Sequence, residues 1–323
     1  MKFLKFDSML FKIIITVVLA SFIPLKGIFI TLFKYLTGIS IAILFFMHGA
    51  KLSHKKIILG SNNWKLHIWI MCSTFIIFPF LGLILVWYDP LSVSSEINNG
   101  FLYLCSMPAT VQSAIAFTSI AEGNVAASIC SASASSLLGI FISPLIINLI
   151  LGLHINIINI DKEIQQIAKI ILQLFIPFLL GHISRYWISQ WIDQNSNLIN
   201  KIDQISILFV VYSAFSKAVT NGIWCQVSAF TILWIAIQCT ILLFFVLMIN
   251  YFAAKLLNFN RQDEIVVLFC GSKKSLANGI PMANVLFPTS TVGIIILPLM
   301  IFHQVQLMVC SYIAQCYKRN NKI

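Results

Sequence analysis

Runs of about twenty apolar residues recur along almost the whole chain, separated by short polar links. A helix of this length spans the hydrocarbon core of a bilayer. In lipid, only helices and closed barrels satisfy every backbone hydrogen bond internally. The chain is 59% hydrophobic and 10% charged, and its mean hydropathy is +0.93. We therefore expect an all-α polytopic membrane protein.

Ten segments qualify as membrane spans, and an even number places both termini on one side. Most of the 21 basic residues then share that side, so the positive-inside rule makes it cytoplasmic. Orientation, rather than a nucleic-acid partner, accounts for the net charge of +11. The expected spans lie near 11–25, 31–48, 65–87, 98–121, 125–152, 164–184, 203–219, 228–254, 265–287 and 291–316.

The start of the chain resembles a signal peptide, because Lys2 and Lys5 precede an apolar run over 13–20. The sequence Ala20-Ser21-Phe22 is a poor cleavage site, however. Removing the segment would also leave nine spans and an inconsistent distribution of basic loops. We expect it to be retained as the first transmembrane helix.

No motif points to an enzyme, a bound cofactor or a metal. The sequence has no phosphate-binding Gly-rich loop followed by Lys, and no Ser/His/Asp or paired-carboxylate arrangement. The six histidines show no metal-ligand spacing. The eight cysteines are scattered singly through apolar spans, which predicts neither a disulfide framework nor a zinc site: Cys72, Cys105, Cys130, Cys225, Cys239, Cys270, Cys310 and Cys316.

One expected span, near 265–287, contains two lysines, a Gly-Ser step, a second glycine and a proline between Phe269 and Met282. Counted from Glu264 at a helical rise, Lys273 lies roughly 13 Å into the membrane. A charge at that depth costs at least ~2.5–3.5 kcal/mol. Broken backbone there is tolerated only where it is buried in protein or lines water. The stretch predicts a transport site.

A polar link over 156–163 divides the spans into five and five, which is the arithmetic of an inverted repeat. The expected repeats are 1–155, with helices 1–5, and 161–323, with helices 6–10. Breaks at 107–110 and 270–272 fall at matching offsets in the two halves. Such pairs of broken helices form binding sites in secondary transporters. A kink at Pro108 that serves only packing is the alternative.

The fifth span begins after Asn124 and is rich in serine, including Ser128. Small residues at this spacing let helices pack closely. Alternatively, Ser128 and a hydroxyl one turn later are ligands of the same site. Both interpretations can hold, because close packing would bring the hydroxyls to the break.

These motifs resemble the bile acid:sodium symporter superfamily, and more narrowly its branch of YfeH-like bacterial proteins and the divergent seventh human member. The resemblance covers nearly the whole chain. It implies ten helices, with a panel of helices 1, 2, 6 and 7 and a core of helices 3–5 and 8–10. It also implies that broken helices 4 and 9 cross, and that the core moves against the panel. It is carried by Phe269-Cys270, Lys274-Ser275-Leu276, Gly279-Ile280-Pro281-Met282, Met107-Pro108, Gln112-Ser113-Ala114, Glu122-Gly123-Asn124 and Ser143-Pro144-Leu145.

The chain departs from the sodium-coupled members of that superfamily. Their helix 9 carries a glutamate and a glutamine that bind sodium, and here Phe269 and Lys273 stand at those positions. Thr74 stands in place of a further glutamine on helix 3. All ten acidic residues are expected in loops or at span ends. Sodium binding is therefore in question.

A fixed lysine can supply the positive charge that an ion supplies elsewhere. Because burial favours the neutral amine, a lysine can also couple transport to protons. The alternative is that one lysine extends its ammonium to the cytoplasmic cavity and only stabilises the break. We favour Lys274 as the buried one, since it matches the branch signature and Lys273 does not.

The most direct interpretation is a solute carrier, a secondary active transporter of a small organic anion in the plasma membrane (the inner membrane if bacterial). A non-transporting regulator of ion or calcium homeostasis and a passive channel are the alternatives. The substrate, the coupling ion and the oligomeric state are left open. The candidate substrate- and ion-binding residues are Thr74, Thr110, Gln112, Ser113, Ser128, Ser272, Lys273, Lys274, Ser275 and Asn278.

The distribution of basic residues yields a test of topology. Single cysteines introduced at positions 54 and 260 of a Cys-free variant should react with an impermeant reagent from the cytoplasmic side. Cysteines at 94 and 159 should react from the outside. Labelling of 54 and 94 from the same side would contradict the span count.

Overall fold

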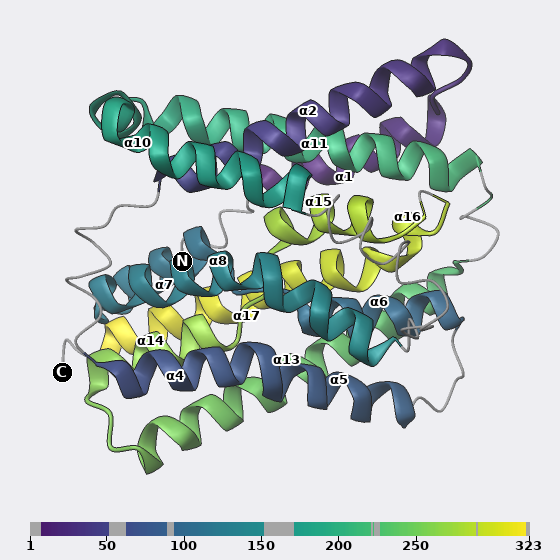
Figure 1. Cartoon of the computed structure of the whole chain (residues 1–323). Coiled ribbons are helices and arrows are strands. Elements are labelled where there is room, and N and C mark those ends of the chain that lie inside the picture. The colour runs from purple at the N-terminus through teal and green to yellow at the C-terminus, as the bar shows by residue number, and fades with distance from the viewer. Residues whose placement is uncertain are drawn as a thin grey trace. The chain divides into compact units, whose positions relative to one another are not determined.

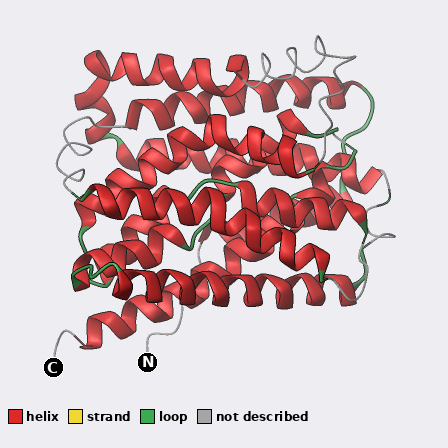
Figure 2. Cartoon of the chain, turned by 60° about the horizontal axis from the view of Figure 1, so that its bottom comes forward, coloured by secondary structure: helices red, strands yellow, loops and turns green. Residues whose placement is uncertain are grey.

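The computed structural model describes residues 8–51, 63–88, 94–151, 171–220, 222, 227–288 and 290–320, and within these ranges it contains helices and no strand (Figure 2). Six helical stretches there are long and apolar enough to cross a membrane. A seventh joins α6, Ser95–Ser106, and α7, Val111–Ile120, which are bent by 59° at a break. The expected multi-pass helical membrane protein is confirmed, whereas the ten-span inverted repeat stays a prediction.

The helices form two compact units, which are described separately. Residues 280–294 group with the first unit. This segment holds the larger part of α15, Leu276–Leu286, and nearly all of α16, Val292–Ile295. The long helices of the first unit are α1, Ser8–Phe22; α2, Ile28–Lys51; α10, Ile176–Gln194, preceded by the π-helical turn η3, Ile171–Phe175; and α11, Ser196–Thr220.

Helices α2 and α10 of the first unit touch at their backbones. A Cβ added to Gly49 would lie 2.0 Å from the Phe178 carbonyl oxygen, and one added to Gly181 would lie 1.9 Å from the Phe46 carbonyl oxygen. Neither site has room for any side chain. Lipid tails cover an apolar helix surface as well as another helix does. Association of helices in lipid therefore depends on close packing of this kind.

An ion pair joins α2 to α11 in the same unit. Lys51, the last residue of α2, donates to the Asp203 carboxylate, which is 4% exposed. The sequence placed Asp203 at the start of a span, but α11 already begins at Ser196. This acidic residue therefore lies inside a helix rather than at its end, paired with a lysine as a buried charge requires.

The second unit contains both helix breaks (Figure 1). Helix α6 ends at Ser106 and α7 begins at Val111, while α14 ends at Gly271 and α15 begins at Leu276. The first interruption falls at the predicted 107–110, and the second, over 272–275, begins at the last residue of the predicted 270–272. The other helices are α4, Trp64–Cys72; the π-helical turn η1, Ser73–Ile77; α5, Phe78–Trp87; α8, Val125–Ile150; α13, Ala229–Leu256; α14, Arg261–Gly271; and α17, Leu297–Asn320.

The starts of α4, α8 and α14 are tied together by one buried carboxylate. Asp263 accepts hydrogen bonds from the side-chain amides of Asn63 at 3.0 Å, Asn124 at 2.9 Å and Asn260 at 3.2 Å. Asn124 and Asn260 also cap α8 and α14, since their amide oxygens accept backbone N–H groups. The network joins the starts of these three helices, and one of them, α14, leads into the second break.

Backbone contact between α2 and α10 predicts a difference between two glycines of one helix. Gly49→Ala should lower the melting temperature, because the added methyl group meets the Phe178 carbonyl and overpacking costs ~1–3 kcal/mol. Gly38→Ala is the control, because no atom lies within 4 Å of its added Cβ. It should leave the melting temperature unchanged or raise it slightly. Equal effects of the two variants in a thermal-unfolding assay would contradict the close packing.

Candidate functional site

The two helix breaks meet and share hydrogen bonds. The Ser275 amide donates to the Pro108 carbonyl at 2.8 Å, and the Thr110 hydroxyl donates to the Lys274 carbonyl at 2.6 Å. Helix ends leave backbone groups without intrahelical partners, which is costly away from water. Each break therefore supplies partners for the other. We call residues 107–110 and 272–275 the break junction.

The ammonium group of Lys274 lies inside the junction and uses all three of its donors. Its Nζ donates to the carbonyl oxygens of Thr74 at 2.8 Å, Cys105 at 2.7 Å and Met107 at 2.6 Å. It also lies 4.1 Å from the centre of the Phe78 ring, a cation–π distance. The side chain is fully buried. Its partners in the described residues are backbone oxygens and a ring face, with no carboxylate among them.

Local sequence explains why the Thr74 carbonyl is available. In the π-helical turn η1, the Phe78 N–H donates to the carbonyl of Ser73 and not to that of Thr74. The next residue, Pro79, has no N–H to offer. The Thr74 carbonyl thus lacks a helical partner, and Lys274 supplies one. Such π-helical turns are frequent at functional sites.

A glutamine of α17 holds the backbone of the second break. The Gln306 Oε1 accepts the Lys274 N–H at 2.9 Å, and its Nε2 donates to the Lys274 carbonyl at 2.9 Å. Sequence reasoning missed this residue. The available signal was an amide in the middle of the apolar run 291–316, where a polar group is costly unless it has a partner.

Lys273 is equally buried but is held differently. Its Nζ donates one hydrogen bond, to the Ser113 carbonyl at 3.0 Å. The same atom lies 3.6 Å from the Phe117 ring centre and 5.5 Å from that of Phe269. The alternative that one lysine extends its ammonium to a cavity is wrong, because Lys273 is fully buried as well as Lys274, the one that we expected to be buried.

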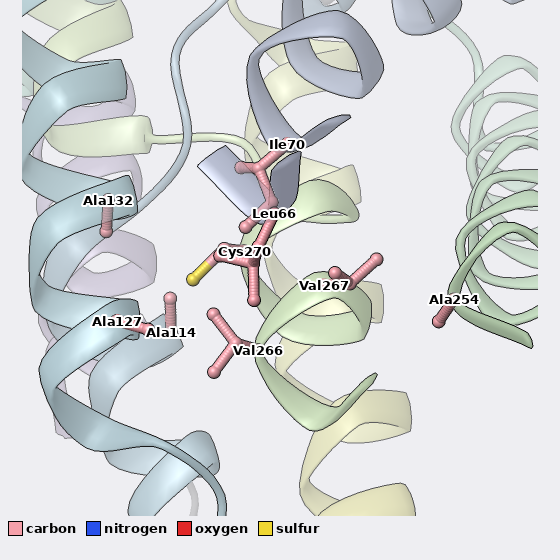
Figure 3. Packing of buried hydrophobic residues seen from close by; sticks show 9 residues of the cluster. All are labelled: Leu66, Ile70, Ala114, Ala127, Ala132, Ala254, Val266, Val267 and Cys270. Carbon is pink, nitrogen blue, oxygen red and sulfur yellow. The ribbon is translucent and has the colours of Figure 1, made fainter. Parts of the chain in front are cut away.

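Ser128 of α8 faces the end of α14. Its hydroxyl accepts from the Thr118 hydroxyl at 3.2 Å and lies 3.3 Å from the Cys270 sulfur. Figure 3 shows that sulfur pointing toward the helices that carry Ala114 and Ala132. Small side chains therefore let α8 approach the break, and the approach also brings the Ser128 hydroxyl beside it. The two interpretations of this segment are compatible.

The other candidate side chains of the second break bind its own backbone or α8. Ser272 donates to the Leu268 carbonyl at 2.5 Å, and the Ser275 hydroxyl accepts the Asn278 N–H at 3.2 Å. The Asn278 side chain donates to the Ser136 hydroxyl at 2.8 Å. These contacts stabilise the backbone of the second break and attach the start of α15 to α8.

The structure separates one candidate from the rest. Gln112 is exposed on α7. By contrast, the hydroxyls of Thr74 and Ser113 are buried and have no hydrogen-bond partner within the described part of the chain. The backbone carbonyls of these two residues each accept a hydrogen bond from a lysine ammonium, that of Thr74 from Lys274 and that of Ser113 from Lys273. A transport role for these residues stays a prediction.

A multi-pass helical protein with two broken helices joined at depth has the architecture of a membrane transporter. The SBF-like CPA transporter family matches residues 7–319, and the chain belongs to that family. It is 55% identical over 316 residues to the protein named "Putative symporter YfeH" of Escherichia coli, covering 98% of this chain and 94% of that one. It is 27% identical over 288 residues to "Sodium/bile acid cotransporter 7" of Xenopus tropicalis, covering 88% and 82%. The resemblance seen in the motifs is confirmed.

The two hydrogen bonds between the Gln306 side chain and the Lys274 backbone predict a specific loss of stability. Gln306→Leu removes the partners of one buried N–H and one buried carbonyl, and each unsatisfied group costs ~1–3 kcal/mol. We expect a clear fall in melting temperature. Gln304→Leu, on the same helix and without a hydrogen bond to the junction, is the control and should change little. A fall that is as large for Gln304→Leu would contradict the role given to Gln306.

Proposed function

We propose that this protein is a secondary active transporter that moves a small organic anion by alternating access, with Lys274 as a resident positive charge in place of a bound sodium ion. The observation that carries the proposal is the ammonium group of Lys274 between three backbone carbonyls at the break junction. Carbonyl oxygens in such a cluster are ligands that a hard cation also takes. Here a covalently attached cation uses them.

The residues present do not fit a sodium ion at this position. Two unit charges 4 Å apart repel by about 4 kcal/mol at an effective dielectric near 20. An ion bound by the same carbonyls would lie at about this distance from the Lys274 ammonium. The preceding residue, Lys273, adds a second positive charge. Phe269 offers an aromatic face where the sodium-coupled relatives are expected to have a carboxylate.

The two lysines are suited to different tasks. A neutral amine has two N–H donors, so deprotonation of Lys274 would leave one of its three carbonyls without a partner. Lys273 has one carbonyl partner and two ring faces, so its neutral form can keep its single hydrogen bond. We assign the fixed charge to Lys274 and any proton exchange to Lys273.

Charge supports an anion as the substrate. Two ammonium groups lie at the junction, and within the described residues neither is paired with a carboxylate. The unpartnered hydroxyls of Thr74 and Ser113 are donors of the kind that bind carboxylate or sulfonate oxygens. One relative is named as a bile acid cotransporter, and bile acids are organic anions.

The proposal includes the whole architecture expected from the sequence. Ten transmembrane helices would form two inverted repeats, with both termini cytoplasmic. A panel of helices 1, 2, 6 and 7 would work against a core of helices 3–5 and 8–10. The breaks between α6 and α7 and between α14 and α15 support this arrangement, since paired breaks at matching offsets are typical of inverted repeats.

The role of Lys274 predicts indifference to sodium. The wild-type protein should have the same melting temperature in sodium chloride as in choline chloride. Lys274→Gln should be markedly less stable, because it removes the donor of three buried carbonyls. Lys273→Gln removes one hydrogen bond and should lose less. Thermal unfolding in detergent measures all three.

Flux completes the test. A thermal-shift screen of organic anions would select a probe, and its uptake into proteoliposomes would be measured in sodium and in choline medium between pH 5.5 and 8.5. Saturable uptake that is independent of sodium and lost in Lys274→Gln is expected. Strict sodium dependence that survives Lys274→Gln would refute the resident charge. No flux for any anion would instead favour a regulator, and non-saturable flux a channel.

A further inference from the structure

A pocket lies at one end of the second unit, away from the break junction. It has a volume of ≈ 510 Å³ and is formed where α13 ends, α14 begins and α17 ends. Figure 1 shows these helix ends gathered at the left of the view. The residues that decide its chemistry are Tyr251, Lys255, Arg261, Glu264 and Tyr317. Neither the candidate transport residues nor the family assignment accounts for it.

The one carboxylate in the pocket is already neutralised. Glu264 is 5% exposed, pairs with the Lys255 ammonium at 2.7 Å and accepts the Tyr317 hydroxyl at 2.6 Å. Asp263, its neighbour in sequence, does not line the pocket and is bound by three asparagine amides. The acidic residues of this region therefore leave positive charge at the pocket uncompensated.

That charge is carried by Arg261. Its guanidinium lies over the Tyr317 ring, 5.6 Å from the centre, and within the described residues it has no carboxylate partner. The side chain is exposed. Lys318 and Arg319 add two exposed basic residues in the last turn of α17. A guanidinium presents several N–H donors in one plane, which match the oxygens of a phosphate.

Apolar surface borders the pocket on the α13 side. Tyr251 is 38% exposed, Phe252 55% and Leu256 82%, all in the last turns of a helix long and apolar enough to span the bilayer. Lipid tails cover such a surface in a membrane protein. The basic pocket thus lies where this apolar surface ends, at the depth of lipid headgroups.

From this juxtaposition we propose that the pocket binds the headgroup of an anionic phospholipid, with its phosphate on Arg261 and its acyl chains along the exposed end of α13. Basic pockets at helix ends are typical sites for such headgroups. The apolar border distinguishes a lipid from a soluble phosphate, which has nothing to place there. A lipid so bound would link α13, α14 and α17, which are the helices that support the second break. This inference does not depend on the transported substrate.

The test uses the purified full-length protein in neutral detergent. Melting temperature is followed as phosphatidylglycerol, phosphatidylcholine or inorganic phosphate is added, and retained lipid is measured by native mass spectrometry. The variants are Arg261→Gln, Arg261→Lys and Lys65→Gln. Lys65 is exposed at the start of α4 and does not line the pocket, so its variant matches the loss of one charge. Lys255 is left intact because its removal would strand the buried Glu264 carboxylate.

We expect phosphatidylglycerol to raise the melting temperature and phosphatidylcholine and inorganic phosphate to have little effect. Arg261→Gln should weaken the apparent affinity for phosphatidylglycerol about fivefold, the factor that one interfacial basic residue is worth. Arg261→Lys should keep the charge but lose part of the affinity, because an ammonium lacks the planar set of donors, and Lys65→Gln should keep all of it. Equal losses in Arg261→Gln and Lys65→Gln would mean diffuse charge and would overturn the site. Stabilisation by inorganic phosphate as strong as by phosphatidylglycerol would overturn the lipid as its occupant.

Discussion

The contact between the Lys274 ammonium and three backbone carbonyls is the interaction on which the second unit depends. In lipid, a broken helix leaves carbonyls that no water reaches, and each costs several kcal/mol unless it finds a donor. A buried ammonium has the opposite need, since it has three donors and a charge to stabilise. The ammonium supplies the donors that the carbonyls lack, and the carbonyls stabilise its charge. The π-helical turn at Thr74, the end of α6 and the second break can coexist because one side chain connects them.

The sequence predicted the breaks because they follow from local rules. Glycine, proline and charge inside an apolar run disrupt a helix or cost energy wherever the run lies. The partners were not predictable in that way. The Thr74 carbonyl is free only because a π-helical turn redirects Phe78 and because Pro79 follows. Gln306 matters only because α17 brings its amide to Lys274. Gln112, placed at the site from sequence, is exposed on α7.

In the first unit, too, the sequence predicted the helices but not their partners. Its helices were expected from hydropathy alone. The contact of α2 with α10, however, depends on Gly49 packing against the backbone of α10 and on Gly181 packing against the backbone of α2. A glycine in an apolar run signals close packing without naming the partner. Asp203 was placed at a span end because the apolar run begins there, yet α11 starts earlier and buries the carboxylate against Lys51. Pairing, which composition does not reveal, allowed the helix to include a charge.

A resident charge has a thermodynamic consequence that a bound ion does not. An ion that binds with the substrate and leaves with it carries the free energy of its own gradient into the transport cycle. The Lys274 ammonium is covalently attached and cannot be exchanged across the membrane, so in the proposed role it would contribute to binding and structure but supply no driving force. If Lys274 replaces sodium, energy for accumulation must come from another species. Lys273, with one carbonyl partner and two ring faces, is the group at the junction that can release a proton at least cost in hydrogen bonds. In the proposed mechanism, the pair would separate two roles that one sodium ion combines: holding the broken helices together and coupling the cycle to a gradient.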